Sequence, residues 1–352
     1  MSRNLPVLVA ALLFAAGYCL CATQFPAFLT TRVVGNLLTD SAFLGIVAVG
    51  TTFVIISGGI DLSVGSVVGF TTVFLALAIE RWGIPPLAAF AIVLGAAALF
   101  GAAMGALIHV FEMPPFIVTL AGMFLARGAG FLLSTESVPI NAPLYSAVAD
   151  LSLSLPGGGR LTLTAGVMLA VFLVGGVLLH ATRFGATVYA LGGSRHTTGL
   201  MGVRVGRNTI AIYALSSLLA ALAGIVFSLD TASGTPLSAV GVELDAIAAV
   251  VIGGTLLTGG QGGILGTFLG VMIGGLIQTA ITFDGTLSSW WTKIATGLLL
   301  FAFIALQQGS VALAGRSGRA ARPRAGQQPV VRPAGRLTHS VHWYVVVCVF
   351  FF

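Results

Sequence analysis

Charged residues are scarce in this chain. Only 7% of its 352 residues are Asp, Glu, Lys or Arg, whereas hydrophobic residues make up 57%. A soluble domain carries roughly 25% charged residues, so a surface that faces water on all sides is excluded. The mean hydropathy of +1.06 and the long apolar runs predict an all-α polytopic membrane protein.

Lysine is scarcer still, and this excludes one kind of site. Lys293 is the only lysine, and it follows Trp290 and Trp291 rather than a glycine-rich loop. A phosphate-binding P-loop needs Gly-x-x-x-x-Gly-Lys-Ser/Thr, so the chain cannot carry one. If the protein uses ATP, the nucleotide must bind to another chain.

Cysteine is also rare, and no metal site or cofactor is predicted. Cys19, Cys21 and Cys348 lack the spacing of metal ligands. The sequence shows no clustered acid/His or Ser/His set, so we predict that the chain is not an enzyme. The net charge of +6 comes from arginines gathered in a few loops, which is typical of cytoplasmic segments and not of nucleic-acid binding.

Apolar runs of spanning length recur along the chain, and each needs roughly 20 residues. We predict about ten transmembrane helices in a domain covering residues 1–310. Residues 311–352 form a predicted cytoplasmic tail, rich in Arg and Pro and disordered. The predicted spans are 5–22, 40–57, 62–80, 87–110, 115–133, 163–180, 209–229, 243–257, 263–282 and 289–306.

The distribution of charge predicts the orientation. Arginines gather in loop 181–208 and in the tail, whereas the loops on the other side carry mainly acids, such as Glu136, Asp150 and Asp284. The positive-inside rule therefore places loop 181–208 and the tail in the cytoplasm.

Two glycine-rich strings, 57–66 and 250–263, interrupt apolar runs. Paired interruptions in the two halves of a membrane protein are typical of an internal repeat around a transport path, although glycines also serve packing and tight turns. The candidate gating residues in these strings are Gly58, Gly59, Asp61, Ser63, Gly65, Gly253 and Gly254.

Asp61 has three interpretations. A carboxylate between apolar runs is costly, which makes it a functional candidate for gating or for direct contact with a substrate. Asp before Leu-Ser-Val is also a good helix cap. The predicted topology places Asp61 near the cytoplasmic face, which favours the cap and turn role.

These strings carry a resemblance to a known family. Residues 57–66 resemble the signature of membrane permease subunits of bacterial ribose-type sugar ABC importers, and 243–255 resemble the second signature of that family. The resemblance covers about residues 3–310. Strings 36–46, 156–161 and 283–294 are most similar to the permease of the galactofuranose importer.

The resemblance implies a multi-pass subunit with the ABC importer permease fold in the bacterial inner membrane. Such a subunit moves a monosaccharide, here galactofuranose first and ribose or a related sugar next. The implied partners are an ABC ATPase subunit, a periplasmic sugar-binding protein, a second permease subunit, identical or not, and membrane lipid. An ion-coupled secondary sugar transporter is the alternative, and it would require acids at mid-depth.

Residues 182–204 of cytoplasmic loop 181–208 are the predicted contact with the ATPase. A short helix with an apolar end and a rim of arginines suits a groove on a soluble partner, and similar importers place their coupling helix here. The other interpretation is that the arginines serve only to keep this loop in the cytoplasm. The predicted coupling residues are Gly192, Gly193, Arg195, Leu200, Met201 and Gly202.

Two acids open the predicted eighth span on the periplasmic side. Glu243 and Asp245 lie two residues apart, so they point to different helix faces. Acids at a helix start are stabilised by the helix dipole. The alternative is that they line an outer vestibule or dock the binding protein. Arg127 is the only arginine deep in an apolar run and should pair inside the bundle.

Overall fold

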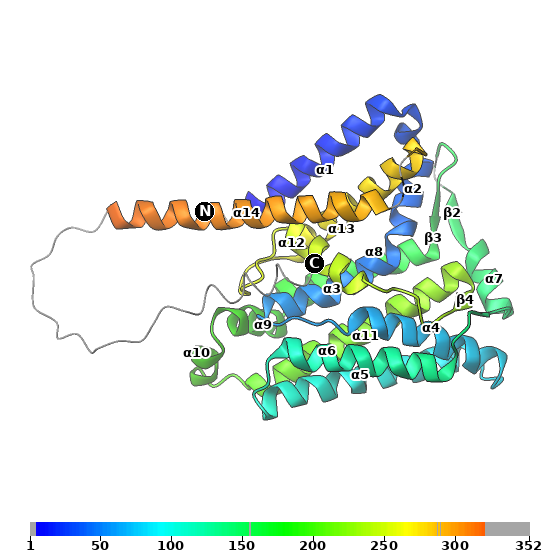
Figure 1. The fold of residues 1–352 in the computed structure, drawn as a ribbon, viewed down its shortest axis with the longest axis horizontal. Helices are drawn as coiled ribbons and strands as arrows, with labels where there is room; N and C mark the ends of the chain where they lie inside the picture. Colours follow the sequence, from blue (N-terminus) through cyan, green and yellow to red (C-terminus); the bar gives the residue numbers. More distant parts are fainter. Residues whose placement is uncertain (1–4, 155, 287, 289, 321–352) are drawn as a thin grey trace, which may run out of the picture. The chain divides into compact units, whose positions relative to one another are not determined.

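The computed structural model describes residues 5–154, 156–286, 288 and 290–320, and this part of the chain is mostly helical (Figure 1). The α-helices are α1 (Leu5–Gln24), α2 (Thr31–Asp40), α3 (Ala42–Ile56), α4 (Val64–Glu80), α5 (Pro86–Val110), α6 (Pro115–Leu133), α7 (Pro143–Asp150), α8 (Leu163–Ala181), α9 (Arg183–Gly193), α10 (Arg195–Leu200), α11 (Val205–Thr231), α12 (Val242–Ile252), α13 (Ile264–Asp284) and α14 (Trp290–Ala320). A 3-10 helix, η1, covers Pro26–Leu29.

Four very short strands lie opposite the end where α9 and α10 gather (Figure 1). Strand β1 (Val138–Pro139) pairs antiparallel with β4 (Ser233–Gly234). Strand β2 (Ser152–Ser154) pairs antiparallel with β3 (Arg160–Thr162). The β-strand end therefore collects the loops that the charge distribution places outside the cell.

Six helices within the described residues are long and apolar enough to cross a membrane, namely α1, α5, α6, α8, α11 and α13. Helices α2 and α3 together make a seventh candidate, bent by 53° at Ser41. Helix α4 and residues 290–305 of α14 are apolar but shorter. The mostly helical membrane architecture is thus established, while the count of ten spans stays a prediction.

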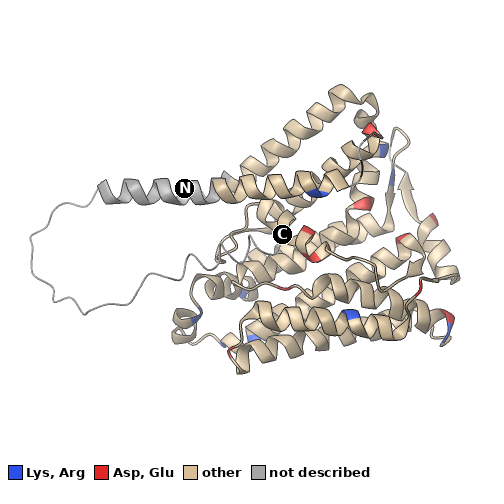
Figure 2. Cartoon of the chain, viewed as in Figure 1, with Lys and Arg blue, Asp and Glu red and all other residues tan. Residues whose placement is uncertain are grey.

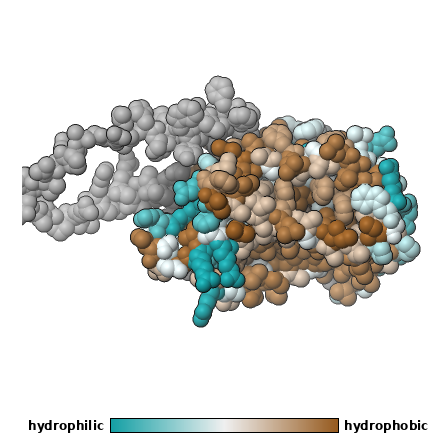
Figure 3. All heavy atoms as spheres, turned by 90° about the horizontal axis from the view of Figure 1, so that it is seen from below, coloured by the Kyte–Doolittle hydropathy of each residue, from teal (hydrophilic) through white to brown (hydrophobic). Residues whose placement is uncertain are grey.

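The outer faces of the helices are apolar, as lipid contact requires. Leu99 on α5, Leu125 on α6 and Leu173 on α8 are each exposed by 65% or more. Figure 3 shows a broad hydrophobic band between two more hydrophilic ends. Charged residues are sparse between those ends (Figure 2).

Helix α11 is the most buried of the six long helices and packs against α3, α4 and α5. Glycines allow the closest approach. A Cβ atom on Gly101 of α5 would clash with the carbonyl oxygen of Tyr213, and one on Gly105 would crowd Ile210. Small residues at such crossings let membrane helices gain packing contacts that apolar side chains alone would not supply.

The chain divides into two compact units, Met1–Leu306 and Gln307–Phe352. The first contains the helical bundle. Of the second, the structure describes only residues 307–320, which continue α14. Residues 311–320 of the predicted tail are therefore helical here, and 321–352 lie outside the described residues.

Candidate functional site

The first glycine-rich string is a true break between α3 and α4. Helix α3 ends at Ile56, and Gly58 adopts a left-handed conformation with φ of +80°. The amides of Gly58 and Gly59 donate to the carbonyls of Ile55 and Val54, at 2.9 and 3.0 Å. This pattern closes a helix C-terminus and turns the chain away. Gly59 also leaves room for the hydroxyl of Tyr213.

Asp61 is completely buried inside this break. Its Oδ1 accepts hydrogen bonds from the amide and the hydroxyl of Ser63, at 2.9 and 2.6 Å. Its Oδ2 accepts one from the hydroxyl of Ser216 on α11, at 2.7 Å. Asp61 thus closes an Asx turn just ahead of α4 and ties that turn to α11.

The depth of Asp61 differs from the sequence expectation. Its partner Ser216 lies eleven residues into α11, which is roughly 16 Å from the α10 end of that helix at 1.5 Å per residue. Asp61 is therefore inside the bundle and not at its cytoplasmic edge. The sequence could not show this, because the pairing with Ser216 spans 155 positions.

The second string separates α12 from α13. Gly253 packs directly on the backbone of Gly266 in α13, and a Cβ atom at either position would clash with the other. Gly254 has a φ of +91° and lies against Pro6 of α1. The two helices are therefore held as a tight pair that only glycine permits at this contact.

Both breaks meet the end of α9 at one point, which we call the glycine junction (Gly58, Gly192 and Gly259). The amide of Gly260 donates to the carbonyl of Ile56 at 2.8 Å. A Cβ atom on Gly192 would clash with that same carbonyl, and one on Gly259 would lie 2.9 Å from the Cα of Gly58. The contact is therefore made by backbone against backbone.

One side chain strengthens this junction. The hydroxyl of Tyr189 on α9 donates to the carbonyl of Gly262 at 2.7 Å. Gly58 and Gly192 are predicted site residues from separate motifs, whereas Gly259 and Tyr189 were not among the predicted site residues. A run of glycines shows that a turn occurs, but it does not identify which glycine contacts a distant helix.

Helices α9 and α10 follow one another at the end of the bundle opposite the strands. Ser194 caps α10, since its hydroxyl accepts from the amide of Thr197 at 3.2 Å. Leu200 and Met201 close α10 and are 76% and 78% exposed. An exposed apolar pair at the tip of a capped helix is a ready contact for a partner protein.

The other predicted coupling residues are placed as follows. Gly193 ends α9 with no atom within 4 Å of the position of a Cβ, whereas its neighbour Gly192 is tightly packed. Arg195 reaches the hydroxyl of Thr209 on α11 at 3.5 Å. Gly202, with a φ of +80°, turns the chain into α11.

Glu243 and Asp245 point in different directions from the first turn of α12. Asp245 forms an ion pair with Lys293 on α14. Glu243 instead faces α4, where a Cβ atom on Gly65 would clash with its Oε2. That oxygen is buried and has no hydrogen-bond partner within the described residues.

Arg127 on α6 holds the non-helical segment that leads into α12. Its guanidinium donates to the carbonyls of Pro236 and Ser238, at 2.5 and 2.8 Å. It is also attracted by the carboxylate of Glu243. The structure therefore supplies the partners that the sequence left unnamed: two backbone carbonyls and one acid.

A model of the family described as "Branched-chain amino acid transport system / permease component" matches residues 33–304. The chain belongs to this permease family. The match covers both glycine-rich breaks and helices α9 and α10, and together with the relatives it confirms a non-catalytic, multi-pass subunit of the inner membrane.

Individual relatives of the chain are also named as permease proteins. The permease is 59% identical to the inner membrane ABC transporter permease protein YjfF of Escherichia coli K12 over 313 residues, covering 89% of this chain and 95% of the relative. It is 38% identical to the fructose import permease protein FruG of Bifidobacterium longum, over 89% of this chain and 93% of the relative. It is 38% identical to the ribose import permease protein RbsC of Escherichia coli K12, over 79% and 86%. No solved structure matches the chain.

Proposed function

We propose that this permease is the membrane subunit of an ATP-driven importer of a monosaccharide. The support is its similarity over most of its length to proteins named as ribose and fructose import permeases. Among sugars we propose galactofuranose first, because strings 36–46, 156–161 and 283–294 resemble the permease of that importer. Ribose and related sugars come next.

The glycine junction is the observation that supports a coupled mechanism. An ATPase subunit that binds Leu200 and Met201 would move α10 and, through it, α9. Since Gly192 touches the first break and the turn between α12 and α13, a shift of α9 would reach both breaks at once. Close-packed backbone transmits displacement because no side chain can rotate to absorb it.

The proposal also covers the extent of the membrane domain, its internal repeat and its partners. The transmembrane domain covers residues 1–310 with ten spans, and the pairs α3–α4 and α12–α13 are corresponding units of an internal repeat. The partners are an ATPase subunit, a periplasmic sugar-binding protein, a second permease subunit and lipid. The exposed leucines of α5, α6 and α8 are suited to lipid.

Asp61 does not favour an ion-coupled secondary transporter. Both of its carboxylate oxygens are occupied by donors from Ser63 and Ser216, and the group is completely buried. A carboxylate whose two oxygens are both hydrogen-bonded in this way stabilises the turn ahead of α4. The arrangement offers no exposed face for a cation.

Reconstituted transport tests the proposal. The permease, with its ATPase, binding protein and second permease, is placed in proteoliposomes, and uptake of radiolabelled galactofuranose and ribose is measured with and without ATP. ATP-dependent uptake of galactofuranose in preference to ribose is expected. Uptake by this chain alone without ATP would contradict the importer, and preference for ribose would overturn only the choice of sugar.

A further inference from the structure

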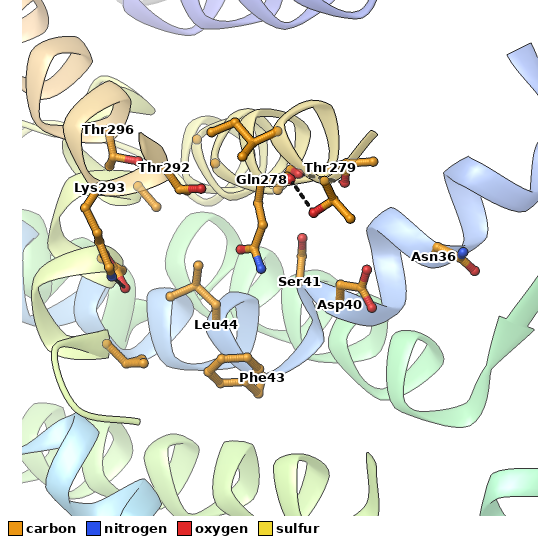
Figure 4. A pocket seen from close by; sticks show the side chains of 18 of the residues that line it. Asn36, Asp40, Ser41, Phe43, Leu44, Gln278, Thr279, Thr292, Lys293 and Thr296 are labelled. Atoms are coloured by element: carbon orange, nitrogen blue, oxygen red, sulfur yellow. Dashed lines mark hydrogen bonds and ion pairs between the residues drawn. The ribbon is translucent and has the colours of Figure 1, made fainter. Parts of the chain in front are cut away.

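A cavity of about 560 Å³ opens on the side of the bundle between α2, α3, α12, α13 and α14 (Figure 4). It extends from Asn36 and Phe283, near the β-strand end, to Gly270 and Ile252 farther inside. Its size falls within the range of small-molecule sites, roughly 300–1,000 Å³. The cavity thus leads inward from the side that the charge distribution places outside the cell.

The walls of this cavity are more polar than a lipid-facing surface. Figure 4 shows Gln278 extending from α13 toward Ser41 and Leu44, with Asp40 beside Ser41. The ion pair of Asp245 and Lys293 forms the opposite side. An amide, two carboxylates and an ammonium group at this depth are costly unless water or a polar ligand fills the space.

The cavity is hollow because one wall is made of glycines on α13. Among the described residues, no atom lies within 4 Å of the position that a Cβ of Gly274 would occupy. Its neighbours Gly270 and Gly275 are different, since a Cβ there would meet the carbonyl of Ala249 or the hydroxyl of Ser41. Gly274 therefore faces the open space, and a larger residue there would fill the cavity without displacing backbone.

We infer that this cavity is an outer docking site for a monosaccharide, in which Gln278 and the Asp245–Lys293 pair bind the hydroxyl groups of the sugar. An amide can both donate to and accept from a hydroxyl group, whereas a carboxylate accepts and an ammonium group donates. Trp290, exposed by 75%, adds an aromatic face at the outer edge. The site deepens the proposed function and rests on it.

A lipid chain or a second permease subunit would fit this cavity less well than a monosaccharide. A lipid chain would leave the side chains of Gln278 and Asp40 without polar partners and would remove water from the Asp245–Lys293 ion pair. The core of an interface between proteins is depleted in charged residues, whereas Asp40, Asp245 and Lys293 all line this cavity. The lining therefore favours a small hydroxylated ligand.

Filling the cavity is the first test. Gly274→Leu is compared with Gly176→Leu on α8, where an added Cβ likewise meets no atom of the described residues within 4 Å but lies outside the cavity. In reconstituted importers, Gly274→Leu should lower kcat/KM for sugar uptake about tenfold or more, and Gly176→Leu should leave it unchanged. Gln278→Leu should raise KM more than it lowers kcat.

A labelling experiment keeps the inference testable if Gly274→Leu fails to assemble. Thr279→Cys, in a chain whose natural cysteines are replaced by Ala, puts a thiol in the cavity wall. Saturating sugar should slow its reaction with maleimide several-fold. An unchanged rate, or a cross-link to the second permease in place of protection, would overturn the docking site.

The outcomes separate this inference from the function on which it rests. Absence of ATP-dependent uptake of every sugar by the wild-type assembly contradicts the importer itself. Normal wild-type uptake together with normal uptake by Gly274→Leu contradicts only the docking site.

Discussion

The glycine junction and the outer cavity use glycine in opposite ways. At the junction, Gly192 and Gly259 bring three backbone segments into contact, and no side chain fits between them. In the cavity, Gly274 leaves a wall empty, so that space for a ligand remains. Glycine thus allows close backbone packing in one part of the permease and leaves open space in another. Composition alone, with 47 glycines, cannot distinguish the two uses.

The largest expected effect lies where helices α12 and α13 touch. Gly253→Val should prevent folding, because its Cβ would clash with the backbone of Gly266, which cannot rotate away. Gly274→Ala, on the hollow side of α13, should be tolerated and should stabilise the helix by up to about 1 kcal/mol. Yield of monodisperse protein and thermal unfolding in detergent measure both. Equal stability of the two variants would show that the backbone contact is wrong.

Arg127→Met should have the next largest effect. The variant loses two hydrogen bonds to the carbonyls of Pro236 and Ser238, and it leaves Glu243 without its positive neighbour. A hydrogen bond to a charged group contributes about 1.5–3 kcal/mol, so loss of the two should lower the free energy of unfolding by about 3 kcal/mol. Adding Glu243→Gln should recover part of the lost stability. A double-mutant cycle with no coupling between the two positions would argue against electrostatic attraction between them.

The effect at Asp61 should depend on the replacement and should be small for Asp61→Asn. Asp61→Asn keeps an acceptor for Ser63 and should retain ATP-dependent uptake. Asp61→Ala leaves the buried donors of Ser63 and Ser216 unpaired and should lower the free energy of unfolding by about 1–3 kcal/mol for each group. Thermal unfolding and uptake are measured side by side. Loss of uptake in a fully stable Asn variant would support the ion-coupled alternative.

The smallest effect on stability is expected at the tip of α10. Leu200→Ser with Met201→Ser should leave the fold intact, because both side chains are more than three-quarters exposed. The same change should reduce co-purification of the ATPase about tenfold or more, as loss of an apolar anchor does. Leu153→Ser, an exposed leucine at the β-strand end, is the matched control. Undiminished co-purification would remove α10 from the proposed coupling path.

The sequence predicted much of the fold, and the limits of the prediction have physical causes. Apolar runs locate α5, α6, α8 and α11 closely, because a membrane span depends only on local composition. The breaks in strings 57–66 and 250–263 were also visible, since glycine is the residue that adopts a positive φ without a steric penalty.

What the sequence left out depends on contacts between distant segments. The partner of Asp61 on α11, the carbonyls that bind Arg127 and the meeting of Gly192 with both breaks are set by packing across the bundle. Helix periodicity predicts that Glu243 and Asp245 diverge, but it does not predict that one faces α4 and the other a cavity. Such pairings require the three-dimensional arrangement.

The most direct test of transmission through the glycine junction compares Gly192→Ala with Gly193→Ala. Sugar uptake and ATP hydrolysis are measured together in the two reconstituted importers. These neighbours differ in one respect, since a Cβ at Gly192 meets the carbonyl of Ile56 and a Cβ at Gly193 meets nothing. A Gly192→Ala importer that assembles should hydrolyse ATP with little uptake, whereas Gly193→Ala should couple the two as the wild type does. Normal coupling in an assembled Gly192→Ala importer would contradict transmission through the glycine junction.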